Sequence, residues 1–287
     1  MILPLIVPQK KFTDIFGNQC AYSEMNPSLY YDPLTEEYTV LVRLVNYRKF
    51  NDRSYVLYEN QSNSEYMISR SKSLTSLEWN PLIINYEGLE IHWTHWKGVE
   101  DIRFIDSKTV LCCIPELHPS GNPTLFTATL ERSTLTNFQQ CSPAPNEKNW
   151  MPFEDKVIYS TSPFIIKSVK EDNQTNLGVI PELEGYHGST NGIKIDDGWI
   201  FLIHKNEDQK VIHRWILYLK TSLKFSAEFI FFPHSYIEFP CSLVVVEKEH
   251  KWIVSLGVND DKAFLIDIDP KHVLERLVAA VEHRFAT

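Results

Sequence analysis

Short apolar segments rich in β-branched and aromatic residues recur along the whole chain, separated by polar turns. They span residues 38–45, 109–114, 124–130, 157–160, 199–204, 212–219, 225–232, 243–246 and 252–256. Their length and composition predict β-strands. Charged turn 247–251 joins two of them into a hairpin, and Asp196-Asp197-Gly198 predicts a tight turn before the strand at Trp199. Proline-rich stretches 115–123 and 142–145 predict loops. The pattern therefore indicates an all-β protein.

The two ends of the chain carry different patterns. Residues 1–8 are apolar but short and interrupted by prolines, which predicts an edge strand and not a signal peptide. Pro270 begins a segment in which apolar residues recur at helical spacing up to Phe285. This spacing predicts an amphipathic helix over about 270–285, packed on the outside of the β body. No apolar run approaches the roughly 18 residues that span a bilayer, so no membrane span is expected.

A polar cluster precedes a short strand and a turn at five places. The clusters lie at residues 26–28, 98–103, 147–150, 187–191 and 237–239. Radial repetition of such units gathers the clusters at one place, as at the centre of a β-propeller. The sequence thus predicts a single domain over residues 1–287, a five-bladed β-propeller. A β-sandwich is the competing architecture.

Composition narrows the classes of function. Aromatic residues make up 13% of the chain, which favours strands and also sugar binding, because a flat ring stacks on a pyranose face. The formal charge of −9 argues against a nucleic-acid partner, whose phosphates require basic residues. The five cysteines include no CxxC pair and fit reduced thiols. A soluble cytoplasmic protein is expected.

Acidic residues at the predicted centre are the candidates for chemistry. Glu100 and Asp101 are adjacent, so on a strand they point to opposite faces. We expect Asp101 to face the centre and Glu100 to brace the backbone or pair with Arg103. Glu238, between two apolar residues, is a candidate for holding sugar hydroxyls or for a second carboxylate role.

Polar residues at strand ends are the candidates for binding. Arg43, Arg48, Lys205 and Arg214 are expected to bind a phosphate or pyrophosphate together, since guanidinium groups make bidentate contacts. The sequence holds no glycine-rich nucleotide loop and no serine elbow, and no cofactor or metal is expected. The other predicted substrate-binding residues share positions in the polar clusters or at strand ends: Asn46, Arg103, Asn149, Trp150, Ser189, Asn191, His204, Asn259 and Asp260.

The run Gly98-Val99-Glu100-Asp101-Ile102-Arg103 resembles the G-x-E-D-P-R signature of glycoside hydrolase family 130, the β-mannoside phosphorylases and β-mannosidases. Ile102 stands where that signature has proline. The clusters at residues 149–152, 188–192 and 255–260 are also similar to motifs of such propellers. The resemblance implies a five-bladed propeller related to β-1,2-mannosyltransferases, with Asp101 at the position of the general acid.

These observations predict an enzyme that transfers a hexosyl group, mannose-like, between a sugar phosphate or nucleotide sugar and a saccharide acceptor. One alternative is a glycosidase of the same fold, with Asp101 and Glu238 as the acid and base pair. Another is a sugar-binding propeller without catalysis.

Overall fold

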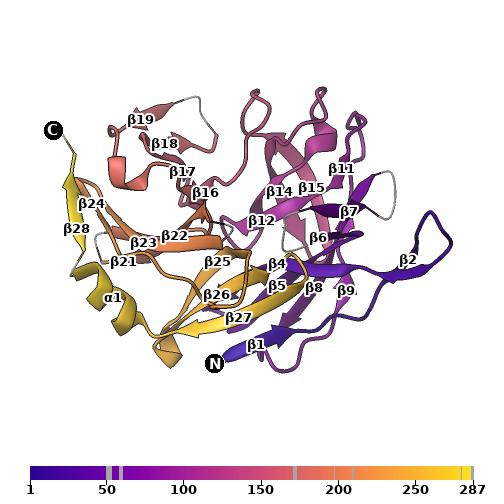
Figure 1. Cartoon of the computed structure of the whole chain (residues 1–287), viewed down its shortest axis with the longest axis horizontal. Coiled ribbons are helices and arrows are strands. Elements are labelled where there is room, and N and C mark those ends of the chain that lie inside the picture. Colours follow the sequence, from indigo (N-terminus) through magenta and orange to yellow (C-terminus); the bar gives the residue numbers. More distant parts are fainter. Residues whose placement is uncertain are drawn as a thin grey trace.

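The computed structural model describes residues 1–49, 54–57, 61–170, 173–196, 198–208, 210–278 and 280–285. Five sheets stand around a common centre, and β4, β12, β16 and β25 lie closest to it (Figure 1). The five-bladed β-propeller is confirmed. Each blade begins at or beside one of the five predicted polar clusters.

The first three blades follow one another along the chain. Blade I contains β4 (Ser23–Asp32), β5 (Glu37–Val45) and β8 (Ser62–Ser71), with β9 (Asn80–Pro81) and β11 (Trp96–Gly98) on the outer edge of β8. Blade II contains β12 (Glu100–Phe104), β13 (Thr109–Cys113), β14 (Leu125–Glu131) and β15 (Thr134–Gln140), with β10 (Ile83–Ile84) outermost. Blade III contains β16 (Met151–Phe153), β17 (Lys156–Thr161), β18 (Phe164–Ser168) and β19 (Gln174–Asn176).

The last two blades include the chain ends. Blade IV contains β20 (His187–Gly188) and β21 (Ile193–Ile195), both paired with β22 (Gly198–Glu207), then β23 (Lys210–Leu219), β24 (Ser222–Phe225) and β28 (Val281–Arg284). Asp197 of the predicted turn lies outside the described residues. Blade V contains β25 (Glu238–Val246), β26 (Lys251–Val258), β27 (Lys262–Ile268) and β1 (Ile2–Leu5).

Two small hairpins and three short turns complete the description. The hairpins are β2 (Lys11–Thr13) with β3 (Gln19–Ala21), and β6 (Tyr47–Lys49) with β7 (Tyr55–Leu57). The 3₁₀ turns are η1 (Pro115–Leu117), η2 (Pro181–Leu183) and η3 (Glu247–Glu249). No helix in the described part of the chain is long and apolar enough to cross a bilayer.

Strand β1 closes the ring. It pairs antiparallel with β27, with Leu3 opposite Leu265, and forms the outermost strand of blade V. The prediction of an N-terminal edge strand is confirmed. Segments from opposite ends of the chain thereby share one sheet.

The C-terminal helix is shorter than predicted. Helix α1 (Pro270–Val278) buries Val273 and Leu277 among core residues of blades IV and V. The chain then forms β28, which pairs with the edge of β24, and Phe285 beyond it stacks on Phe164 at 5.9 Å between ring centroids. The helical spacing therefore does not extend to Phe285, because an open sheet edge offers the backbone a ladder of hydrogen bonds.

The inner strands are joined through small buried serines. Ser255 donates to the backbone oxygen of Pro27 at 2.5 Å, and the backbone N–H of Leu29 donates to Ser242 at 2.7 Å. Serine is small enough to sit where strands converge, and its hydroxyl satisfies backbone groups that no neighbouring strand reaches. The centre of the ring is therefore fixed by polar contacts, and apolar side chains fill the spaces between blades.

The predicted strand over 225–232 is wrong. Strand β24 ends at Phe225, and the chain then crosses from blade IV to blade V as a loop. The backbone N–H groups of Phe231 and Phe232 donate to the carboxylate of Glu238, at 2.8 and 2.6 Å. The aromatic rings of this loop are partly buried against blades IV and V, and Phe229 stacks on Trp215 with 6.0 Å between ring centroids. Phe229 alone in this loop pairs with a strand, in an isolated antiparallel bridge to His213, so the β-like composition reflects burial more than sheet pairing.

Candidate active site

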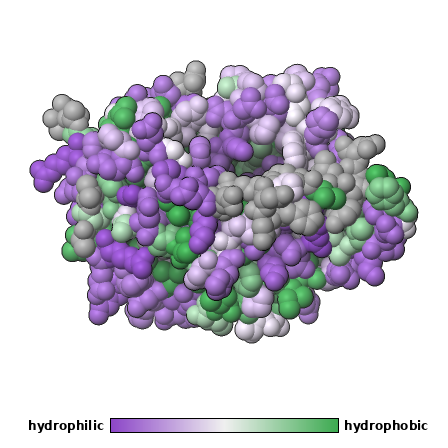
Figure 2. All heavy atoms as spheres, viewed as in Figure 1, coloured by the Kyte–Doolittle hydropathy of each residue, from purple (hydrophilic) through white to green (hydrophobic). Residues whose placement is uncertain are grey.

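A cavity of 610 Å³ opens at the centre of the ring, at the ends where the inner strands begin. All five blades contribute to its lining. A hollow lies near the middle of the molecule between hydrophilic side chains in Figure 2. Its lining includes Asn26, Arg43, Glu100, Asp101 and Asp260.

An irregularity in β12 directs two adjacent acids into this cavity. The pairing register of β12 with β13 shifts between Glu100 and Arg103, and Asp101 has φ of 46°. Strict strand alternation is therefore broken, and both Glu100 and Asp101 line the cavity. The predicted pairing of Glu100 with Arg103 is wrong. Glu100 pairs with Arg43, at 2.5 Å between Oε1 and Nη2.

The carboxylate of Asp101 accepts hydrogen bonds through one of its two oxygens. Oδ1 accepts hydrogen bonds from Asn26 Nδ2 at 2.9 Å and from Arg43 Nη1 at 3.3 Å. No described residue hydrogen-bonds to Oδ2. One oxygen thus fixes the orientation of the group, and the other is available to a ligand in the cavity.

Arg43 forms ion pairs with both Glu100 and Asp101. Its guanidinium is buried, donates through Nε to Ser64 at 3.0 Å, and bonds both Glu100 and Asp101. Burial raises the pKa of Glu100, an effect that the charge of Arg43 opposes. Burial likewise raises the pKa of Asp260, against the opposing charge of Lys49, which lies 3.4 Å away. A site with several carboxyl groups in a partly dry cavity is suited to proton transfer.

Both carboxylate oxygens of Glu238 accept hydrogen bonds. Its side chain is 1% exposed, and Oε2 accepts from His213 Nε2 at 3.1 Å and from Phe231 N–H. Oε1 accepts from Phe232 N–H and from Ser235 Oγ at 2.5 Å. Burial alone would raise the pKa of Glu238, yet the hydrogen bonds from His213, Ser235 and Phe231 together hold it below its ordinary value. A carboxylate has about four lone-pair sites, and all four are used here.

His204 lies deep in the wall of the cavity. Burial, together with the neighbouring histidines, holds the pKa of His204 well below its ordinary value of 6.5. Its Nδ1 lies 2.8 Å from Ser189 Oγ. The native protein therefore keeps this imidazole neutral, whereas the unfolded chain protonates it near pH 6.5.

This difference predicts an acid-sensitive fold. Below pH 6.5 the unfolded state binds a proton that the native state excludes. The free energy of unfolding should therefore fall as the pH falls, by about 1.4 kcal/mol per pH unit for this one group. His204→Gln should flatten that slope in denaturant titrations between about pH 7.5 and pH 5. His272→Gln, at an exposed position of helix α1, is the matched control and should not flatten the slope.

The structure brings some predicted site residues together and places others elsewhere. Six predicted residues line the cavity: Arg43, Asp101, Asn149, His204, Glu238 and Asp260. Nine lie outside its lining: Asn46, Arg48, Arg103, Trp150, Ser189, Asn191, Lys205, Arg214 and Asn259.

The predicted four-cation phosphate site is not assembled. Arg43 lines the cavity, but Arg48 forms an ion pair with Asp261. Lys205 lies 3.7 Å from Glu207 and is outside the cavity lining.

Arg214 is also turned away from the cavity. It bonds Glu228 at 3.0 Å and the hydroxyl of Tyr186 at 2.8 Å. Strand-end placement alone does not determine which face of a strand a side chain occupies.

Several predicted binding residues hold the backbone of the ring instead. Arg103 is buried and donates from Nε to Ser189 O at 2.5 Å, which links blades II and IV. It also donates to the backbone oxygen of Asp101 at 3.1 Å. Asn191 links blades IV and V through both backbone groups of Leu243, at 2.9 and 3.0 Å. These contacts brace the walls and the backbone beneath Asp101.

Three further predicted residues brace loops beside the cavity. Asn46 accepts from Asn63 N–H at 2.6 Å, and Asn259 Oδ1 accepts from the backbone of Ile237 at 3.2 Å. Trp150 is buried and donates from its indole to Glu147 at 3.0 Å.

The sequence reasoning missed residues that line the cavity. Lys148 and His187 belong to two of the predicted polar clusters but were not among the predicted binding residues, and Lys49 ends a short strand beside Arg48. Tyr159 and Asn206 come from second strands, with no local signal to mark them. Membership of the polar clusters at 147–150 and 187–191 was the available signal for Lys148 and His187.

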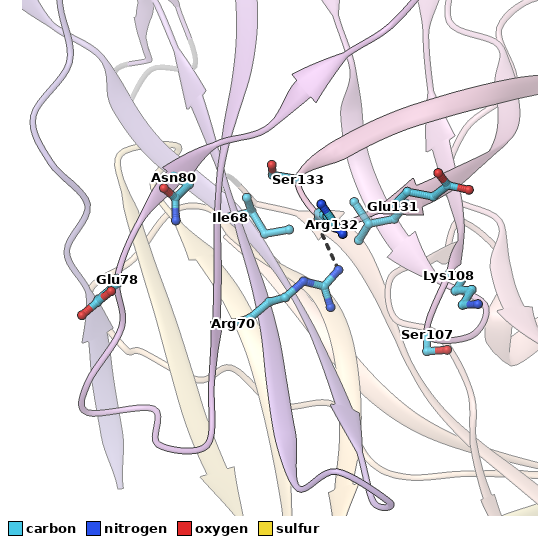
Figure 3. A pocket seen from close by; sticks show the side chains of 10 residues that line it. Ile68, Arg70, Glu78, Asn80, Ser107, Lys108, Glu131, Arg132 and Ser133 are labelled. Atoms are coloured by element: carbon cyan, nitrogen blue, oxygen red, sulfur yellow. Dashed lines mark hydrogen bonds between the residues drawn. The ribbon is translucent and has the colours of Figure 1, made fainter.

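A larger cavity, of 720 Å³, lies at the other end of blades I and II. Its lining includes the β12–β13 turn, at the opposite end of β12 from Asp101, with Ile68 and Leu130 buried. Figure 3 shows the Arg70 guanidinium directed to the backbone oxygen of Arg132, at 3.1 Å. Among the described residues, the cluster of acids around a buried arginine is a feature of the central cavity and not of this one.

No protein-family model matches the sequence. No curated protein matches it at the level of sequence. Solved structures are similar in fold. One is a β-1,2-mannobiose phosphorylase from Listeria innocua, with a TM-score of 0.66 and 16% identity, covering 97% of each chain.

Two further structures share the fold at lower similarity. A putative glycoside hydrolase from Bacteroides ovatus has a TM-score of 0.55 and 12% identity, over 96% of this chain and 94% of that one. A β-xylosidase has a TM-score of 0.54 and 7% identity, over 91% and 96%. The chain has their fold. At these identities the likeness extends to the arrangement of blades along nearly the whole chain.

Proposed function

We propose that this chain is a carbohydrate-active enzyme that transfers a hexosyl group, mannose-like, between a sugar phosphate or nucleotide sugar and a sugar hydroxyl. Asp101 is the general acid or base. The observation that carries this proposal is the geometry of its carboxylate: Oδ1 is anchored by Asn26 and Arg43, and Oδ2 is open to the cavity. A fixed carboxyl group with one free oxygen is equipped to pass a proton to or from a bound hydroxyl.

Two similarities support a carbohydrate-active enzyme. The run Gly98–Arg103 resembles the glycoside hydrolase family 130 signature, in which Asp101 occupies the general-acid position. The fold is also similar to that of a β-1,2-mannobiose phosphorylase. We therefore propose that the chain belongs to this group of propellers and acts on a mannose-like sugar.

A group of basic residues faces the same cavity and suits a phosphate-bearing donor. Arg43, Lys49, Lys148 and His187 all line it. Lys148 is exposed and forms no ion pair with a described residue, so its charge is available to a ligand. In this proposal Lys148 and His187 contact the phosphate in place of Arg48, Lys205 and Arg214.

Replacing Lys148 by alanine is expected to raise the KM for a sugar-phosphate donor about tenfold, with a smaller effect on kcat. A hydrogen bond to a charged group contributes roughly 1.5–3 kcal/mol, which corresponds to a tenfold or larger change in affinity. Lys205→Ala is the matched control, because Lys205 pairs with Glu207 outside the cavity lining. Equal changes in KM for the two variants would remove Lys148 from the donor site.

The geometry favours transfer over hydrolysis by an Asp101–Glu238 pair. A general base must offer a free lone pair to the attacking water. Glu238 already accepts hydrogen bonds at both oxygens, two at each. We therefore assign Glu238 a structural role, as the group that fixes the loop between blades IV and V.

A donor-by-acceptor screen with mass spectrometry tests the proposal. Mannose 1-phosphate and GDP-mannose serve as donors and simple sugars as acceptors, with parent protein and Asp101→Asn compared. A product that is lost in the variant supports transfer, and the donor that works distinguishes phosphorylase from nucleotide-sugar transferase. Free sugar as the product would indicate hydrolysis. Saturable sugar binding with no product would indicate a binding propeller.

A further inference from the structure

An exposed apolar segment precedes strand β11 of blade I. Residues 89–93 belong to no helix or strand, and the side chains of Leu89, Ile91 and Trp93 are 39%, 48% and 68% exposed. Of the seven tryptophans, all within the described residues, Trp93 alone is exposed. The ring of Trp93 is the largest of these three groups.

The backbone around Trp93 is firmly held. Thr94 is buried and donates to the backbone oxygen of Gly121 at 2.7 Å, and Gln61 donates to the backbone oxygen of Thr94 at 2.5 Å. Gly121 has φ of 66°, and a Cβ there would lie 2.5 Å from the backbone oxygen of Trp93. Only glycine permits so close an approach of the two loops. The backbone at Trp93 is thus fixed by contacts within the protein.

The ring itself is also oriented. His95 packs edge-on against Trp93, with ring centroids 4.3 Å apart and planes at 76°. This contact limits rotation of the indole, so little conformational entropy is lost when a ligand stacks on it.

Contacts on both sides connect this segment to the central cavity. On one side Trp96 packs edge-on against Tyr47, whose side chain lines the cavity, with centroids 6.1 Å apart. On the other side, loop 115–123 contacts loop 142–149: His118 Nε2 lies 3.3 Å from Pro143 O, and Glu147 N–H donates to Pro123 O at 3.0 Å. Residues 146–149 line the cavity. Trp93 therefore lies between two segments that each contact the lining of the cavity.

We propose that Trp93 is a stacking platform for a distal sugar unit of an oligosaccharide whose reacting end lies in the central cavity. A flat indole matches the C–H face of a pyranose. Three apolar side chains separated by polar ones are too few for a standard protein interface. The placement of the reacting end rests on the proposed function, but binding at Trp93 does not.

Calorimetric titration tests this platform without turnover. Mannose and a β-1,2-linked mannose tetrasaccharide are titrated into Asp101→Asn and into the same variant carrying Trp93→Ala. The tetrasaccharide should bind roughly three- to tenfold more weakly when Trp93 is removed, and mannose should bind equally to both. Phe16→Ala, which removes an 82% exposed ring from the β2–β3 hairpin, is the matched control and should change neither affinity.

The outcomes separate the two proposals. Equal tetrasaccharide affinity with and without Trp93 overturns the platform, and so does a change in oligomeric state in place of a change in affinity. A Trp93-dependent preference for the longer saccharide supports the platform even if the donor screen yields no product. If neither saccharide binds, both the stacking role of Trp93 and the proposed sugar ligand are rejected.

Discussion

Replacing Asp101 by asparagine is expected to lower turnover by a factor of about 100 to 10 000, the usual contribution of a general acid or base. Asparagine keeps the size of the side chain and an oxygen that accepts from Asn26 and Arg43, so the local structure should persist. An amide cannot exchange a proton at the position of Oδ2. The measurement is the initial rate with the donor and acceptor identified in the screen, alongside the thermal unfolding midpoint of each protein.

Asp261→Asn is the matched control for this change. Asp261 follows Asp260 in the chain, but its side chain is 46% exposed, pairs with Arg48 and lies outside the cavity lining. Its replacement should leave the rate within about twofold of the parent, because an exposed ion pair contributes little. Parent-level activity in Asp101→Asn would contradict the mechanism, and unfolding of that variant would show up in its midpoint.

Replacing Glu238 by alanine is expected to lower the free energy of unfolding by about 3–5 kcal/mol. The substitution leaves four buried or partly buried donors without their acceptor: His213, Ser235 and the backbone N–H groups of Phe231 and Phe232. Each buried donor left unpaired costs free energy, and the loop between blades IV and V loses its attachment. Denaturant unfolding, with its slope checked for two-state behaviour, measures the loss.

The control for this loss comes from the same loop. Glu228 is exposed and bonds Arg214 and Tyr186, so Glu228→Ala should lower the free energy of unfolding by about 1 kcal/mol or less. Comparable losses in the two alanine variants would mean that the buried network around Glu238 contributes little. A small loss in Glu238→Ala would return that carboxylate to the candidates for catalysis.

The sequence predicted the blades because each one repeats the same local order of polar cluster, apolar strand and turn. Strand β5 begins one residue before its predicted start, and the hairpin of β25 and β26 lies where its apolar runs and charged turn indicated. The segment at 225–232 misled, since buried aromatic loops and strands have similar composition. The end of α1 was also missed, because the free edge of β24 is a tertiary feature with no local signal.

The candidate site was only partly predictable. Strand alternation predicted that Asp101 faces the centre, and the resemblance placed it at the general-acid position, but the same alternation assigned Glu100 the wrong partner. The shift in register that turns both acids inward depends on how β12 meets β13, which residue spacing does not reveal. Arg43 faces the cavity while Arg214 faces away, although both lie on strands. Which face of a strand is central depends on the whole ring.

The closure of blade V by β1 has a consequence for how the molecule acquires its fold. Leu3 finds its partner only at Leu265, so a growing chain that lacks β27 leaves β1 with an unpaired edge. Pairing between such distant segments carries a large loop-closure entropy and makes folding slow. The interval before closure is when an exposed strand edge invites association with other chains. Removal of β1 should therefore increase aggregation during refolding far more than its four residues would suggest.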